Sequence, residues 1–248
     1  MKLLKLILLF IYCLATSNLF AQSPQAIETD LLQSFKKIDY NNQDNGNAND
    51  QFAKKLKKYA EKYPFSIRLD FASLKAARLD ISTSTDNLFR IYSWDTWTGG
   101  TMHYFENVFQ YKYEAKTFAQ LDTPKTEGDN CPNYYKMFTF KVNDQTYYLP
   151  VYKSIGSSRD VGEGICVYTL KAGKLNEVKI IKTPSGLHNK LSYNYDFGSV
   201  VDWKVRPFIS FDNKAQTIQI PLVTNKGKVT HKYIIYKFTG QYFEKVKN

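Results

Sequence analysis

Alternating apolar and polar residues dominate the chain from residue 79 onward and predict strands joined by short turns. From Ile81 to Tyr113 the order is strand, tight turn, strand, a loop that contains Gly99 and Gly100, and a third strand. The same order returns twice further along the chain, although few side chains match. The sequence therefore predicts a repeat of geometry: three antiparallel β-units of about four strands each.

Pairs of turn residues mark the spacing of these units. Each unit has two such pairs, separated by about 28 positions. The pairs are Asp86-Asn87 and Glu114-Ala115, Asn143-Asp144 and Ala172-Gly173, and Asp212-Asn213 and Thr239-Gly240. The units span about 79–120, 134–182 and 200–245. Three units are fewer than the roughly four to eight blades of an ordinary propeller, so we predict a mainly β fold of antiparallel meander units, either an open propeller-like stack or a sandwich.

Two stretches before the β-region have apolar residues at helical intervals. These residues are Ile27, Leu31, Phe35 and Ile38 in the first stretch, and Phe52, Leu56, Tyr59 and Tyr63 in the second. Ser23-Pro24 opens the first helix, and Pro64 ends the second. The polar stretch at 41–46 lacks the ligands of a calcium loop, and we interpret it as a flexible linker. We therefore predict two α-helices in an N-terminal segment at 22–64 and a β-domain at 65–248.

Three shorter patterns refine the β-domain. Residues 65–71 alternate between apolar and polar, which predicts that the domain starts with a strand. Pro150 and Pro221 lie inside predicted strands, and we expect each at an edge or a bulge, because proline cannot donate to a strand ladder. We expect residues 183–197 to be a long surface loop, because they contain Pro184 and a glycine.

The start of the chain has the pattern of a secretory signal peptide. Two lysines precede an apolar run from Leu6 to Leu14, which is shorter than the roughly 20 residues of a membrane-spanning helix. We place cleavage after Ala21, with residues 15–17 as the weaker alternative, and Cys13 lacks the small residues that precede a lipidated cysteine. We therefore expect a signal peptide at 1–21 and a periplasmic or secreted mature chain without a transmembrane segment.

Composition and charge narrow the class of protein. The chain has 19 Tyr and 17 Phe, which suit pleated surfaces and supply the apolar area for a core. The formal net charge is +11, and loss of the two lysines in the signal peptide leaves +9. We interpret this basic balance as one that keeps an exported protein soluble, and we expect no specific nucleic-acid partner.

The mature chain keeps two cysteines, Cys131 and Cys166. An oxidising compartment permits them to bond, and closing a loop of that size contributes about 4 kcal/mol in the chain-entropy model. The sequence does not fix the distance between them. A disulfide and two separate buried thiols are therefore both open.

Three runs of residues carry a resemblance to a known group of proteins. They are FRIYSWDT (Phe89–Thr96), TGGTMH (Thr98–His103) and YKFTGQYF (Tyr236–Phe243), and with a signal peptide that ends in Ala-Gln they resemble uncharacterised secreted β-rich proteins of the Bacteroidota. The resemblance covers most of the mature chain. It implies an exported β-rich protein, but no activity and no catalytic residue.

The sequence has no pattern of catalytic residues. Asp95, His103 and Glu106 are close in sequence, but a strand from Thr101 to Tyr111 would point His103 and Glu106 to opposite faces, with Asp95 in the preceding loop. The three histidines, His103, His188 and His231, have no second residue at metal-ligand spacing. We therefore predict no catalytic residue, no metal and no cofactor.

The predicted meanders place a candidate binding surface. In each unit the connection between the second and third strands lies at the end opposite the two tight turns, because antiparallel strands reverse direction. These connections are residues 95–100, 153–164 and 224–228. Stacked units would bring them to one end and gather five candidate ligand-binding residues: Asp95, Trp97, Arg159, Asp160 and Lys226.

An aromatic face beside charged groups suits a carbohydrate or a protein loop. We therefore predict a binding or structural module of the bacterial cell envelope, with a glycan or an envelope protein as its partner. The alternative is a hydrolase of envelope or extracellular polysaccharide that uses loop carboxylates.

Overall fold

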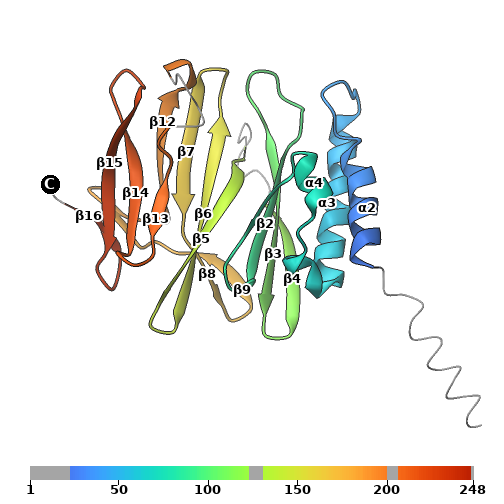
Figure 1. The fold of residues 1–248 in the computed structure, drawn as a ribbon, viewed down its shortest axis with the longest axis horizontal. Helices are drawn as coiled ribbons and strands as arrows, with labels where there is room; N and C mark the ends of the chain where they lie inside the picture. Colours follow the sequence, from blue (N-terminus) through green and yellow to red (C-terminus); the bar gives the residue numbers. More distant parts are fainter. Residues whose placement is uncertain (1–22, 123–130, 200–205, 247–248) are drawn as a thin grey trace, which may run out of the picture.

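The computed structural model describes residues 23–122, 131–199 and 206–246. They form a layer of helices and three β-sheets that follow one another along the long axis of the molecule (Figure 1). Neighbouring strands are antiparallel, apart from one parallel pair. The predicted mainly β, antiparallel fold class is therefore confirmed.

Helices form the first layer: α2 (Pro24–Phe35), α3 (Asn45–Lys62) and α4 (Ala72–Ala76), with a 3-10 helix, η1 (Pro64–Arg68), before α4. The first predicted helix corresponds to α2, where the Oγ of Ser23 caps the helix by accepting the N–H of Ala26 at 3.1 Å. The second corresponds to α3. The five-residue α4 was not predicted, so the described residues contain three α-helices and not two.

The linker predicted at 41–46 is wrong at its end, because α3 already begins at Asn45. The Oδ1 of Asn45 accepts the N–H of Asp39 at 3.1 Å, and its Nδ2 donates to the carbonyl oxygen of Asp39 at 2.6 Å. The Oδ1 of Asn42 accepts the N–H of Asp44 at 2.9 Å. These amides satisfy backbone groups in a compact turn, which is why an asparagine-rich stretch here is ordered and starts a helix.

The strand predicted at 65–71 is also wrong. Pro64 starts the 3-10 helix η1, in which Leu69 donates its N–H to Ser66 at 3.1 Å. The carbonyl oxygens of Ser66 and Leu69 then accept from the buried guanidinium of Arg90 at 2.9 and 2.7 Å. Satisfying this buried charge requires both carbonyls on one side of the chain, which a strand would not provide.

The first sheet is a four-stranded meander of β1 (Asp80–Thr83), β2 (Phe89–Asp95), β3 (Phe105–Tyr113) and β4 (Lys116–Asp122). Its two predicted turns lie between β1 and β2 and between β3 and β4. Asn87 and Glu114 occupy these turns with φ of 57° and 53°. Asn143 and Ala172 have the same left-handed backbone at turns of the second sheet, which follows the rule for tight hairpins.

The second sheet contains β5 (Asn133–Val142), β6 (Gln145–Ile155), β7 (Asp160–Cys166), β8 (Tyr168–Lys171), β9 (Lys174–Glu177) and β12 (Lys190–Asp196). Strands β7 and β8 pair with the same edge of β6 in one register, since Val151 faces Ile165 and Tyr148 faces Tyr168. They act as one strand interrupted near Val167. Pro150 does not lie at an edge or a bulge as predicted: β6 is an inner strand, and Pro150 pairs with Met137 of β5 but falls between Tyr148 and Val151, where the pairing of β6 passes from β8 to β7.

The third sheet has the order β11-β10-β16-β15-β14-β13. Its strands are β10 (Ile181–Thr183), β11 (Gly186–His188), β13 (Ser210–Asp212), β14 (Thr217–Val223), β15 (Val229–Phe238) and β16 (Phe243–Lys245). Strand β10 pairs in parallel with β16, and a register shift between β14 and β15 lies at Pro221, where a bulge was predicted. The first sheet is a simple four-stranded meander, whereas β12 is added to the second sheet and β10 and β11 are added to the third. The strand order therefore does not confirm a repeat of equal units.

The surface loop predicted at 183–197 is wrong, because this stretch contains β11 and β12. Strand β12 pairs with β7 over its whole length, from Lys190 opposite Cys166 to Asp196 opposite Asp160. The alternation of Leu191, Tyr193 and Tyr195 with polar residues is the strand signal in this stretch. Pro184 and Gly186 belong only to the short turn before it.

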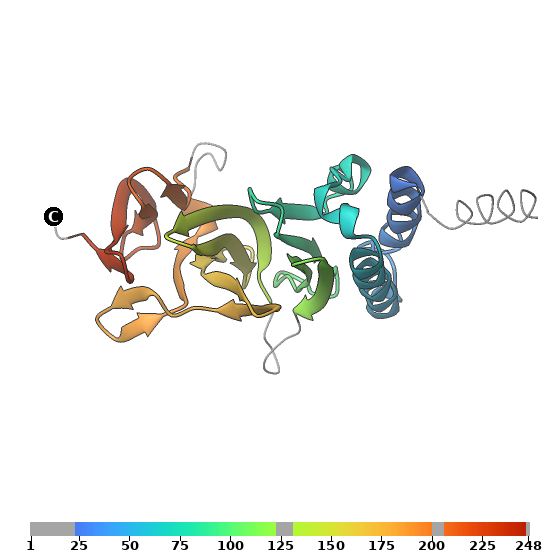
Figure 2. The same cartoon turned by 90° about the horizontal axis from the view of Figure 1, so that it is seen from below.

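Apolar clusters fill each space between layers. One joins the helices to the first sheet through Phe52, Leu56 and Trp94, and a second joins the first sheet to the second through Phe89 and Tyr148. A third lies between the second and third sheets. Seen from below, the first sheet has helices on one side and the second sheet on the other (Figure 2). Its central strands are therefore covered on both faces, which explains why six consecutive residues of β2 are buried.

A buried ion pair ties the residue before the third sheet to the second sheet. The side chains of Arg206 and Glu163 are 9% and 1% exposed, and both Nη atoms of Arg206 donate to the carboxylate. The hydroxyls of Tyr135 and Tyr193 donate to it as well, at 3.3 and 2.5 Å. Burial alone would lower the pKa of Arg206, but the hydrogen bond and charge of Glu163 outweigh it, so the net pKa is raised.

Both cysteines are buried in the structure. The Sγ of Cys131 lies 4.0 Å from the carbonyl oxygen of Asp122, and Cys166 belongs to the aromatic cluster between the first and second sheets. A disulfide between Cys131 and Cys166 stays a prediction.

We predict that Arg206→Met destabilises the fold by about 3–5 kcal/mol, because it leaves the buried carboxylate of Glu163 without its counter-charge. Arg159→Met is the matched control: Arg159 also pairs with a carboxylate, but its side chain is 73% exposed, so the free energy of unfolding should hardly change. Urea denaturation followed by circular dichroism measures both. Equal midpoints for the two variants would contradict a structural role for the buried pair.

A second prediction concerns Glu106 on β3. Its Oε2 is buried without a hydrogen-bond partner among the described residues, and burial, with a smaller contribution from the charge of Asp50, raises its pKa to about 7. The folded chain therefore binds this proton more tightly than the unfolded chain, and the resulting stability is lost as the pH rises through 7. Between about pH 5 and pH 8 we expect a loss of about 1–2 kcal/mol, reduced by partial solvent screening.

Glu106→Gln, which cannot ionise, should remove this part of the pH dependence, whereas Glu114→Gln on an exposed turn should keep it. The measurement is the free energy of unfolding from urea titrations at several pH values. The same pH slope in the wild type and in Glu106→Gln would refute the assignment.

Candidate functional site

The three connections singled out in the sequence lie at the same end of the three sheets (Figure 1). The first and second are joined by the N–H of His103, which donates to the carbonyl oxygen of Ile155 at 3.1 Å. The second and third are joined through Asp196 at the end of β12, whose N–H donates to Gly227 at 3.0 Å and whose carboxylate pairs with Arg159. The connections therefore form one continuous ridge.

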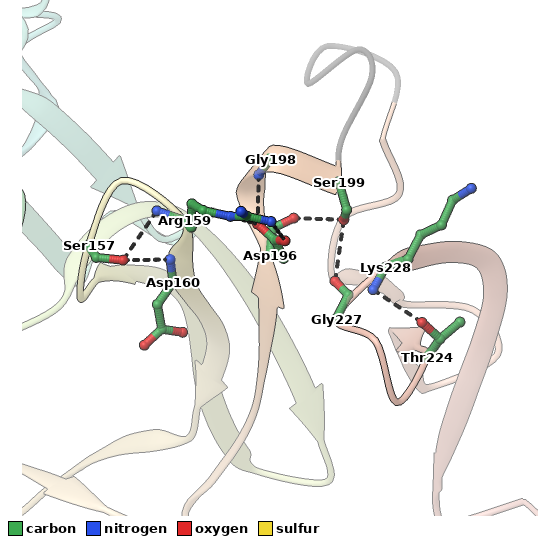
Figure 3. Close-up of polar contacts among 9 residues, drawn as sticks. All are labelled: Ser157, Arg159, Asp160, Asp196, Gly198, Ser199, Thr224, Gly227 and Lys228. Carbon is green, nitrogen blue, oxygen red and sulfur yellow. Dashed lines mark hydrogen bonds and ion pairs between the residues drawn. The ribbon is translucent and has the colours of Figure 1, made fainter.

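On this ridge Arg159 is committed to Asp196 (Figure 3). Its Nε donates to Oδ1 of Asp196 at 3.0 Å, and its Nη2 donates to Oδ2. The N–H of Gly198 donates to the same Oδ1 at 2.9 Å, and the hydrogen bond from Arg159 is the main reason that the pKa of Asp196 is lowered. Asp196 is not among the predicted site residues, because it ends strand β12, where the sequence predicts a surface loop.

The other two candidates on the ridge are not brought into a common site. The backbone N–H of Asp160 donates to the Oγ of Ser157 at 2.9 Å, and its carboxylate points away from Asp196 (Figure 3). Lys226 lies in an exposed turn that closes through hydrogen bonds between residues 224 and 228. Arg159, Asp160 and Lys226 therefore do not converge on one ligand position.

Asp95 and Trp97, in contrast, line one pocket with a volume of about 280 Å³. The pocket lies where α2, the residues around β1, the first connection and the strands β5 and β6 meet. Its polar lining residues are Arg78, Asp80, Asp95, His103, Asn133 and Lys153, and its apolar ones include Phe35, Ile38, Trp97, Phe105 and Ile155. Residues from the helices, the first sheet and the second sheet thus share one cavity.

Asp95 is held on both carboxylate oxygens. Oδ2 contacts the Nδ1 of His103, and Oδ1 accepts the N–H of Trp97 at 2.9 Å. The predicted strand start at Thr101 is wrong, because β3 begins only at Phe105; His103 therefore lies in the connection, where it contacts Asp95, the last residue of β2. Glu106 is on the face of β3 toward α3 and does not line this pocket.

Trp97 has a strained backbone at the pocket wall. Its φ is 54°, a left-handed conformation that is costly for a bulky residue. Besides its bond to Asp95, its carbonyl oxygen accepts from the Nδ2 of Asn45 at 3.3 Å, and its ring meets that of Tyr40 edge-on with centroids 6.3 Å apart. The start of α3 and the first connection therefore fix this indole together.

Of the two glycines in the same connection, only one is required, and the reason is the lack of room for a side chain and not the backbone angle φ. Neither Gly99 nor Gly100 has a positive φ. A Cβ on Gly99 would lie 2.0 Å from the carbonyl oxygen of Met102, whereas one on Gly100 would meet nothing within 4 Å. Only Gly99 is needed for a close approach.

Asn133 offers an unused acceptor at this pocket, and its orientation follows from its neighbours. The Nδ2 of Asn107 donates to the carbonyl oxygen of Pro132 at 3.1 Å, so its Oδ1 accepts the only hydroxyl hydrogen of Ser93, at 2.6 Å. Ser93 can then only accept, and it does so from the Nδ2 of Asn133 at 3.1 Å and the N–H of Tyr134 at 3.0 Å. The Oδ1 of Asn133 is left buried without a partner among the described residues.

A wider groove of about 810 Å³ lies on the third sheet, between β10, β15 and β16. Its lining is mostly aliphatic and aromatic, with Lys182 paired to Glu244 at 2.8 Å. The exposed lining of this groove is more apolar than that of the Asp95 pocket. We therefore take the smaller pocket as the candidate binding site.

The chemistry of the pocket is that of hydrogen bonding. Each carboxylate oxygen of Asp95 already contacts a protein group, one the N–H of Trp97 and the other the Nδ1 of His103, and the second ring nitrogen of His103, Nε2, is left for a further hydrogen bond. Within the described residues no group of three or more His, Cys, Asp or Glu side chains could hold a metal ion. The arrangement can bind a polar ligand beside an indole ring.

Two further observations bear on function. No helix in the described part of the chain combines the length and the apolar character needed to span a bilayer. Comparisons of the chain with protein-family models, with curated proteins and with solved structures found no match.

Proposed function

We propose that this protein is an exported binding module of the bacterial cell envelope, periplasmic or secreted, and that its ligand is a glycan or an envelope protein. The observation that carries the proposal is the pocket beside Trp97, which is lined by Asn133, whose buried Oδ1 has no hydrogen-bond partner among the residues that the structure describes. Such an acceptor costs about 1–3 kcal/mol unless a donor reaches it. A ligand would supply that donor.

Binding is favoured over hydrolysis of a polysaccharide. Asp80 and Asp95 share the pocket, and a pair of carboxylates is the usual equipment of a glycoside hydrolase. Asp95, however, uses one oxygen for the N–H of Trp97 and the other for His103. These two contacts favour a positioning role for Asp95, which orients Trp97 and His103.

Export rests on the sequence pattern alone, since the signal peptide, its cleavage point after Ala21 and Cys13 lie outside the described residues. The resemblance to secreted β-rich proteins of the Bacteroidota supports the same compartment. We also propose that the three sheets derive from three like units, with β1–β4, β5–β9 and β13–β16 as their meanders. The common end of the three connections supports this origin.

We predict that the mature chain binds an envelope glycan or protein and that Trp97→Ala weakens this binding at least 10-fold, because it removes the aromatic wall of the pocket. Arg159→Ala is the control, since its side chain pairs with Asp196 away from the pocket. Glycan arrays and pull-downs from envelope fractions, followed by titration of any ligand found, measure the effect. Loss of binding in Arg159→Ala with full binding in Trp97→Ala would move the site to the ridge.

A separate prediction tests export. The product outside the cytoplasm should begin at Gln22 and carry no lipid, because the apolar run is short and Cys13 lacks a lipidation context. N-terminal sequencing and intact mass measure both properties. A chain that retains Met1 would refute export, and an acylated Cys13 would refute the soluble form.

A further inference from the structure

The pocket beside Trp97 has a defined pattern of unmet hydrogen bonds. The Oδ1 of Asn133 cannot exchange places with Nδ2, because Ser93 has no hydrogen left to donate. The acceptor is therefore fixed in place before any ligand arrives. A group that satisfies it has to donate an N–H or O–H hydrogen.

Lys153, which lines the same pocket, requires a hydrogen-bond acceptor on the ligand. Lys153 pairs with Asn133 across β5 and β6 and lines the same cavity, and its ammonium can only donate. A ligand that matches the pocket therefore has to donate and accept hydrogen bonds over a few ångströms, and hydroxyl groups do both.

Size and shape narrow the class further. The volume of about 280 Å³ is at the lower limit of the roughly 300–1,000 Å³ of ordinary ligand sites, so the pocket holds about one ring and not an extended chain. Trp97 provides an apolar wall, which suits the C–H face of a ring whose edge carries hydroxyls. A lysine side chain would satisfy Asn133 but would leave Lys153 facing a like charge.

We propose that the pocket binds a single sugar residue, at the end or on a branch of an envelope glycan. One hydroxyl donates to the Oδ1 of Asn133, another accepts from Lys153, and the ring lies against Trp97. This inference rests on the proposed function and specifies its ligand. Asp95 and His103 act as positioning residues for the indole and for the rim of the cavity.

Saturation-transfer NMR of the mature chain with a panel of free hexoses, hexosamines and uronic acids tests this class. At least one monosaccharide should give a signal, with a dissociation constant in the millimolar range. Lys153→Met and Trp97→Ala should each weaken its binding about 10-fold or more, whereas Lys226→Met, which removes an exposed lysine on the ridge, should not.

Deoxy analogues of the bound sugar test the contact with Asn133. Removing one particular hydroxyl should weaken binding to the wild type, and the same removal should have no further effect on a folded Asn133→Leu variant. If that variant does not fold, the Lys153→Met comparison with analogues lacking the accepting hydroxyl serves the same purpose. Equal losses in variant and wild type at every position would overturn the assigned contacts.

The outcomes separate this inference from the proposed function. If no monosaccharide binds but an envelope protein does, and Trp97→Ala abolishes that binding, the sugar class is wrong and the binding function stands. If neither sugars nor envelope components bind, both proposals fail.

Discussion

The central strands of the first sheet are covered on both faces, and much of the structure follows from this constraint. Helices cover one side and the second sheet covers the other, so the buried polar side chains of these strands depend on partners in the neighbouring layers. Arg90 bonds to two carbonyl oxygens of the η1 region, and Gln110 bonds to Ala60 at the end of α3. The Oγ of Ser93 accepts the N–H of Tyr134 on β5. These bonds fix where the helices and the second sheet lie.

The candidate site is a product of the same constraint. At the end of the first sheet the three layers meet without closing completely, and the Asp95 pocket lies at this junction. The hydrogen bonds that Ser93 accepts from Asn133 and Tyr134 join β5 to β2, and they also orient the amide of Asn133. One set of buried bonds thus stabilises the fold and leaves a defined acceptor at the cavity. A site built in this way is rigid, because its polar groups are held by the core and not by the loops alone.

The sequence predicted the local features of this structure well, since turns and strand alternation depend on neighbouring residues. Hairpins at Asn87, Glu114 and Asn143 lie where residues that tolerate a left-handed backbone follow alternating strands. The sequence-based prediction is wrong where a contact with a residue far along the chain determines the local conformation. Residues 65–71 alternate like a strand, but Arg90 on β2 draws two of their carbonyl oxygens to one side.

The same limit applies to the site. Asp95 and Trp97 were identified because loops at one end of a β-structure commonly bind ligands. His103 folds back onto Asp95 because β3 starts later than alternation indicated, and Asn133 comes from a strand almost 40 positions away. Neither contact has a local signature. Asp196 would have been found from the alternation that ends β12, which the proline and glycine before it obscured.

The parallel pairing of β10 with β16 sets an order of assembly. Strand β10 ends at residue 183, but its partner begins at residue 243, so the third sheet cannot close until the last part of the chain has been made. Every residue that lines the Asp95 pocket lies between positions 35 and 155. Because chains are made from the N-terminus, this cavity can assemble before the final strand of the third sheet has been made. The protein thus completes the end that carries the pocket before it completes the opposite end.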